Sequence, residues 1–176
     1  ASGTGNISFT SANVRTQQVS TVTVTPTQGV CMGTPVTFTI TVNPKPTVDD
    51  PPNITVCAGD QVDVPLTSPN GSPTFNWTNN NVNIGLAGTG SGDISFTAAN
   101  VVNNQTGTIV ITPVENGCTG PTQNFTITVG PLPSVNPPAD VMVCGGGPVT
   151  VVFSGSPGGT TFAWTNDNTG IGLGAM

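Results

Sequence analysis

The chain has 176 residues, of which 23 are Gly and 17 are Pro, and only 6% are charged. Glycine and proline at this density interrupt any helix, so the composition excludes a helical protein and favours an all-β fold. A net charge of -6, with Arg15 and Lys45 as the only cations, excludes nucleic-acid binding because the phosphate backbone would be repelled. Histidine and tyrosine are absent, which removes common catalytic groups and argues against an enzyme. No segment approaches the roughly 20 apolar residues of a membrane-spanning helix, so membrane insertion is not expected.

The sequence repeats itself at an offset of 87 residues without a gap, and about 39 of 87 aligned positions are identical. Each repeat carries one tryptophan and two cysteines at matching places. Proline-dense segments at 44–52 and 131–138 indicate stiff linkers at the start of each repeat. We therefore expect 1–43 to be the C-terminal half of one repeat, 44–130 a complete repeat, and 131–176 the N-terminal half of the next.

Within the complete repeat, apolar and polar residues alternate between turn residues, which predicts seven strands packed as a β-sandwich. The expected strands are, in chain order, 54–57, 62–66, 74–78, a weaker one near 81–86, 94–97, 108–112 and 124–129. One side chain in two should face inward: Val62, Val64, Leu66, Phe75, Trp77, Ile94, Phe96, Ile109, Ile111, Phe125, Ile127 and Val129. Trp77 in the third strand is typical of the core tryptophan of an immunoglobulin-like (Ig-like) sandwich.

Several sequence patterns carry a family resemblance: Val-Cys-Ala-Gly-Asp at 56–60, Thr-Phe-Asn-Trp-Thr-Asn at 74–79, Gly-Asp-Ile-Ser-Phe-Thr-Ala-Ala-Asn at 92–100, and Phe-Thr-Ile-Thr-Val at 125–129. With them, the chain resembles the PKD-like or HYR-like tandem repeats of very large Bacteroidota surface proteins, among them SprB-type gliding adhesins. The resemblance implies an all-β chain of Ig-like sandwich repeats, export by the type IX secretion system, and a place outside the cell on its surface.

The four cysteines lie at matching repeat positions in a chain without histidine, which favours disulfides over zinc and over a cysteine nucleophile. We expect Cys57 to pair with Cys118 inside the complete repeat, while Cys31 and Cys144 pair with cysteines outside residues 1–176. Turns at opposite ends of a sandwich leave a second pairing open, in which Cys57 reaches a neighbouring repeat. A pairing of Cys31 with Cys57 is disfavoured, because a strand and a proline-rich linker separate them.

Calcium is a second interpretation of the acidic residues near the first linker, which are Asp49, Asp50, Asp60 and Asp63. The aligned positions of the next repeat hold Asn136, Pro137, Gly147 and Thr150, which supply little charge. We therefore expect solvated acids, no cofactor, and no catalytic or metal-binding residue.

These features predict a structural stalk or filament segment of a large extracellular bacterial adhesin, whose partners are neighbouring copies of the same repeat and a glycan or protein ligand at a distal tip. Two other hypotheses stay open. The repeats could themselves bind a glycan or protein through loops 79–83 or 115–123, or they could be accessory modules of a secreted hydrolase.

The way in which repeats follow one another also has two interpretations. We favour a continuous covalent array, because repeat arrays are common and isolated half-repeats would expose strand edges. Alternatively, separate chains could complete each other's half-repeats by strand complementation and form a filament without a covalent link.

Overall fold

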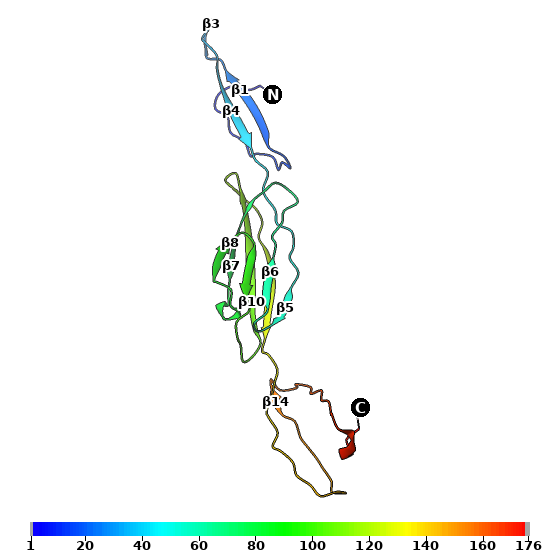
Figure 1. Ribbon diagram of the computed structural model, residues 1–176. Helices are drawn as coiled ribbons and strands as arrows, with labels where there is room; N and C mark the ends of the chain where they lie inside the picture. The colour runs from blue at the N-terminus through cyan, green and yellow to red at the C-terminus, as the bar shows by residue number, and fades with distance from the viewer. Residues whose placement is uncertain (1, 175–176) are drawn as a thin grey trace.

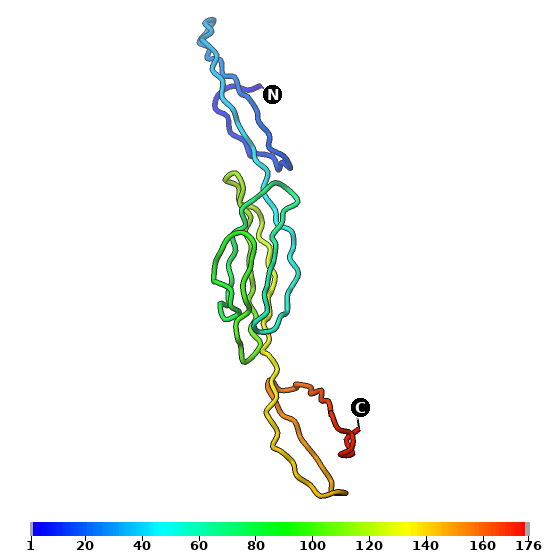
Figure 2. The backbone as a smooth tube through the Cα atoms, viewed as in Figure 1, coloured from blue at the N-terminus to red at the C-terminus, as the bar shows by residue number. Residues whose placement is uncertain are grey.

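Strands form almost all the regular structure of the chain, as expected from its composition, and the fold is all-β. A computed structural model describes residues 2–174. The chain forms three bodies in a row, with residues 44–130 in the middle (Figure 1). The smooth trace shows that the chain enters the middle body at one end and leaves it at the other (Figure 2).

The larger sheet of the middle body contains five strands in the order β5, β12, β10, β7, β8. Their bounds are Ile54–Cys57 for β5, Thr74–Asn79 for β7, Thr89–Ser91 for β8, Gln105–Glu115 for β10 and Gln123–Gly130 for β12. The short strand β11, Cys118–Thr119, pairs with the end of β10. Neighbouring strands are antiparallel except β5 and β12, which run parallel with Cys57 opposite Gly130.

The smaller sheet consists of β6, Gln61–Val64, and β9, Ile94–Thr97, paired antiparallel. Side chains from both sheets meet in one hydrophobic core that includes Val62 and Ile94 from the smaller sheet and Trp77, Ile111 and Ile127 from the larger one. The inward alternation expected from the sequence is confirmed, with Phe96 half-buried at the margin and the other eleven expected positions buried. The linker packs onto the same core through Val48, which is also buried.

One expected strand is wrong. In place of the weak strand near 81–86, the chain forms the 3-10 helix η1, Val82–Ile84. The Asn81 side chain accepts a hydrogen bond from the backbone N–H of Asn83, which starts the turn. Gly85 ends it with a φ of 99°, a left-handed conformation that favours glycine. Ile84 and Leu86 are still buried in the core, and their spacing of two residues is the same as that of inward-facing residues in a strand.

Residues 2–43 form a ladder of β1, Gln18–Val24, with β4, Val36–Val42, extended by the short pair β2, Thr27–Gln28, and β3, Cys31–Met32. The β1–β4 register equals that of β10–β12 after a shift of 87 residues, since Val22 faces Phe38 as Ile109 faces Phe125. Residues 131–174 contain β13, Ser134–Val135, β14, Gly155–Ser156, and the 3-10 helix η2, Thr169–Ile171.

Matching side chains differ in exposure between the middle body and its neighbours. Phe38 is 45% exposed whereas Phe125 is 2% exposed, and Trp164 is 38% exposed whereas Trp77 is 8% exposed. The middle body contains both sheets that enclose a core. Each neighbouring body contains only part of the strands that would form such a sandwich. The exposure therefore depends on whether the covering segment is present, not on the residue itself.

Replacing Phe125 with Ala should lower the unfolding free energy of the middle body by about 3–5 kcal/mol, because a buried aromatic side chain is lost and a cavity remains. Phe38→Ala is the matched control at the aligned, exposed position and should leave that transition unchanged. Urea unfolding followed by Trp77 fluorescence in a Trp164→Phe background measures both. Equal midpoints for the two variants would contradict the assigned core.

Candidate functional site at the joint between units

The structure places Cys57 and Cys118 at opposite ends of the middle body, so the expected disulfide between them does not form, and both are free thiols. Cys57 ends β5 opposite Gly130, where the chain leaves the body. Cys118 lies in β11, before the start of β12. The eight residues of β12 run from the end of the body near Cys118 to the end near Cys57. A strand of that length spans about 26 Å, far beyond the reach of a disulfide. Cys57 lies at the exit end because β5 pairs parallel with β12, which ends there at Gly130.

Cys31 and Cys144 are exposed free thiols in the two flanking bodies, and the structure brings neither of them to another cysteine. Cys31 lies in the short β2–β3 hairpin, remote from the middle body (Figure 1). Their expected partners lie beyond residues 1–176, so these two pairings stay a prediction.

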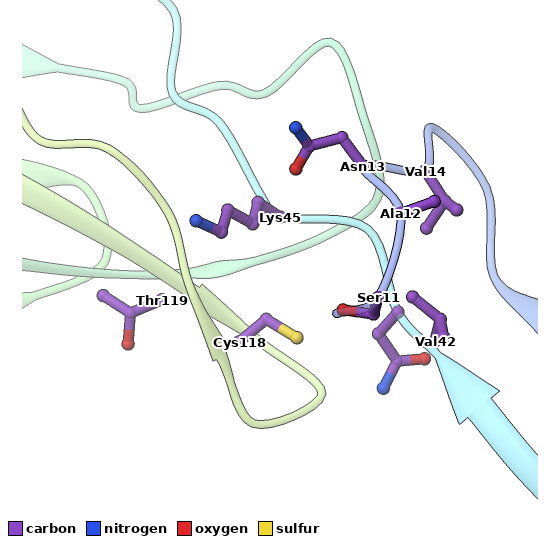
Figure 3. A pocket seen from close by; sticks show the side chains of 9 residues that line it. Ser11, Ala12, Asn13, Val14, Val42, Lys45, Cys118 and Thr119 are labelled. Atoms are coloured by element: carbon purple, nitrogen blue, oxygen red, sulfur yellow. The ribbon is translucent and has the colours of Figure 1, made fainter. Parts of the chain in front are cut away.

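Cys118 lines a cavity of ≈ 420 Å³ at the joint between residues 2–43 and the middle body. The other lining residues come from the two sides of the joint: Ser11, Ala12, Asn13, Val14, Val42, Asn43, Lys45 and Thr119. The Cys118 sulfur points across the cavity toward Ser11 and Val42 (Figure 3). A half-buried thiol thus faces a neighbouring body rather than its own core.

Two side-chain hydrogen bonds meet at Asn43 in this joint. The Asn43 side chain donates a hydrogen bond to the backbone carbonyl of Asn116, with 3.2 Å between nitrogen and oxygen. Gln17 in turn donates to the Asn43 side-chain oxygen at 2.7 Å. Asn116 has a φ of 49°, which turns the β10–β11 hairpin so that its carbonyl meets the preceding body. Asn43, the residue directly before Pro44, thus links the two bodies through its side chain.

The sequence pointed to Cys118 and to loop 115–123, but it gave no sign of the joint residues that precede the middle body. Ser11, Asn13 and Asn43 are small polar residues with no motif around them, and their role depends on a contact across 73 or more residues of chain. The signal that could have found Asn43 is its place directly before Pro44, at the end of the last strand of a repeat.

The four acidic residues do not form one cluster. Asp49, Asp50 and Asp63 line a surface hollow of ≈ 380 Å³, while Asp60 lies in the turn after β5 and accepts from the Cys57 N–H at 2.8 Å. Within residues 2–174, no three acidic or cysteine side chains lie close enough together to hold a metal ion.

The acids instead hold local structure. The Thr67 hydroxyl donates to Asp49 at 2.6 Å, and the Ser95 hydroxyl donates to Asp63 at 2.6 Å, across the β6–β9 pair. Hydrogen bonds from Ser95 and then Gln61 lower the pKa of Asp63 below its usual 3.8, with a small opposing effect of desolvation. The Asp63 carboxylate therefore supports the β6–β9 pairing, and Asp49 binds Thr67 beyond the end of β6.

Loop 79–83, a candidate binding loop, has most of its amide groups occupied internally. Asn79 is buried, and its side-chain N–H groups donate to the backbone carbonyls of Asn81 and Leu86, both at 3.0 Å. The Asn81 amide donates to Gln105 and to the Thr106 carbonyl. In the second candidate loop, 115–123, Glu115 accepts from the Ser72 N–H and Asn116 contacts Asn43. Loop 79–83 therefore supports the fold, and loop 115–123 supports both the fold and the joint.

No protein-family model matches this chain, and a search of curated proteins finds no match. None of the helices in residues 2–174 is long and apolar enough to cross a membrane.

Ser95→Ala should raise the pKa of Asp63 toward 3.8, because the strongest hydrogen bond to its carboxylate is removed. Since the folded pKa of Asp63 is lowered, the hydrogen bonds stabilise the fold above pH 3.8, and this stabilisation is lost as the pH falls through the lower folded value. Carboxyl NMR titration of the two proteins measures the shift. An Asp63 pKa that does not move on substitution would contradict this role of Ser95.

Asn79→Ala should destabilise the middle body by about 1–3 kcal/mol, since buried carbonyl groups of the η1 loop lose their donor. Asn166 makes the matching contacts to Asn168 and Leu173 in an exposed setting, so Asn166→Ala is the control and should have little effect on that transition. Thermal unfolding of both variants tests the difference, and an Asn79→Ala protein as stable as the control would refute a structural role.

Proposed function

We propose that the chain is a stalk segment of a large extracellular bacterial adhesin, built from Ig-like β-sandwich units of 87 residues that follow one another head to tail. The observation that carries the proposal is the path of the chain. It enters the middle body beside Asn116 and leaves it at Gly130, at the opposite end (Figure 2). Units connected in this way extend in one direction.

The length of a unit follows from its longest strand. The eleven residues of β10 span about 36 Å at roughly 3.3 Å per residue, and the proline-rich linker adds to this. Each further unit therefore extends the stalk by roughly 40 Å. A repeated module of this kind gives reach with little new sequence, because each unit contacts only its neighbours.

The internal use of polar groups also supports a structural role. The buried Asn79 amide, several acidic side chains and both candidate loops bind neighbouring backbone or side-chain groups of the same chain. Such side chains are not free to recognise a ligand, so we assign adhesion to another part of the protein. Export by the type IX system and a link to gliding motility follow from the family resemblance, as parts of this proposal.

Resistance to proteolysis fits the same role. Only Arg15 and Lys45 offer sites for trypsin-like proteases, and Lys45 is followed by Pro46. A fibre outside the cell benefits from this composition.

Gene fusions test the stalk directly. Residues 1–174 contain two repeats, so copies of this segment joined without a linker keep the 87-residue spacing. Negative-stain electron microscopy of two, four and six copies should show rods that lengthen by roughly 80 Å per copy. Particles that remain compact as copies are added would refute the stalk.

A second experiment separates a stalk from a binding module. Deleting one copy from a native array should shorten the surface fibre while leaving binding per cell nearly unchanged, and adhesion assays with fibre-length measurements read out both. Loss of binding in proportion to the units deleted would favour repeats that themselves bind a ligand.

A further inference from the structure

The exposed apolar face of residues 2–43 identifies the kind of segment that should cover it. In the middle body, residues 44–86 complete the core around β9, β10 and β12: β5 and β7 extend the larger sheet on either side of the β10–β12 pair, and β6 pairs with β9 in the smaller sheet that packs against it. Phe9, Val24 and Phe38 match Phe96, Ile111 and Phe125 around that core but are 61%, 45% and 45% exposed. The partner that fits is a segment of the 44–86 type, which would form the first half of the unit that ends with residues 2–43.

Such a segment carries a cysteine whose place can be derived from the repeat. In the middle body, the turn that follows Cys57 rests on two backbone positions, Gly130 and Ala98. Ala58 donates its N–H to the Gly130 carbonyl at 2.8 Å, and Gly59 donates to the Ala98 carbonyl at 2.9 Å. With the offset of 87 residues, Gly130 corresponds to Asn43 and Ala98 corresponds to Ser11.

Asn43 and Ser11 both line the cavity into which the Cys118 sulfur points (Figure 3). The cysteine turn of a preceding unit would rest on these two residues and so form a further wall of the same cavity. Two separate register positions thus place the missing cysteine beside Cys118. At the other end of the middle body, exposed Cys57 lies beside the exit at Gly130, ready for the next unit.

We infer that Cys118 forms a disulfide with the cysteine of the preceding unit that occupies the position of Cys57, so that every joint of the array is closed by one covalent bridge. The inference rests on the head-to-tail arrangement proposed above. It explains why no two cysteines of this chain lie together: each one has its partner in the adjacent unit.

The bond forms by two thiol–disulfide exchanges with a disulfide oxidant. One cysteine thiolate attacks a sulfur of the oxidant and displaces its first thiol, and the second cysteine thiolate attacks the mixed disulfide and displaces the other. The two cysteines together lose two protons and two electrons, and the oxidant takes them up as two thiols. Oxidised glutathione is a suitable oxidant for the test.

The experiment uses residues 1–174 joined directly to a second copy, residues 1–176. This fusion builds a complete middle unit from residues 131–174 of the first copy and 1–43 of the second, with eight cysteines in all. After oxidation by glutathione at low protein concentration, we expect two disulfides and four free thiols. Cys144 of the first copy pairs with Cys118 of the second, and Cys57 of the first pairs with Cys31 of the second.

Thiol counting and mass spectrometry of peptides cut at aspartate identify the bonds, since an aspartate lies between each cysteine and the next along the fusion. Cys118→Ser provides a matched pair of variants. In the second copy it should leave five free thiols, because Cys144 of the first copy loses its partner. In the first copy, which has no preceding unit, it should leave three and preserve both bridges.

Hydrogen exchange separates failure of the bridge from failure of the stalk. If the new middle unit is protected from exchange but Cys57 pairs with Cys118 inside one copy, or no disulfide forms, the inference is overturned and the stalk proposal stands. If the middle unit is not protected, the head-to-tail arrangement fails and the bridge fails with it. Protection together with the two expected linkages supports both.

Discussion

The structure depends on packing the smaller sheet, β6 and β9, against one apolar face of the larger sheet. Two ladders, β1–β4 and β10–β12, have the same register and nearly the same apolar residues. Yet Ile111 is fully buried whereas Val24, its counterpart, is 45% exposed. Backbone hydrogen bonds are satisfied in both ladders, so packing between the two sheets, not strand pairing, makes the middle body a stable unit. Half of a repeat therefore has secondary structure without a core.

Much of the fold followed from period-two alternation, because one buried face imposes that period on every strand. Alternation gave the strand positions and the inward side chains, including Trp77 and Ile111. It could not give strand direction, and the parallel pairing of β5 with β12 is what moved Cys57 to the exit end. The contacts at the joint could not be predicted from the sequence either, since Asn43 and Asn116 meet only through tertiary structure. The η1 turn was missed because a side-chain cap at Asn81 overrode an apolar spacing that suits a strand.

Asparagine and aspartate side chains serve the turns. Asp93 accepts from the Leu66 N–H, Asn53 accepts from the Thr126 N–H, and Asp60 accepts from the Cys57 N–H, each at 2.8 Å. Short polar side chains can satisfy backbone donors wherever a strand ends or a turn interrupts a ladder. A chain with only ten charged residues can therefore keep its loops ordered.

Stiffness of an array is decided at its joints, where the packing is thinnest. The hydrogen bond from Asn43 to Asn116 is exposed, and a bond of this kind contributes only about 0.5–1.5 kcal/mol. Pro44 and Pro46 restrict the backbone of the linker, but they do not fix the angle between two bodies. Gly130 replaces Asn43 at the next joint, so that hydrogen bond is not repeated along the chain, whereas the cysteines recur at every repeat. A covalent bridge across the joint would restrain its angle regardless of which residue precedes the linker prolines, and the side chains around it would then be free to vary between units.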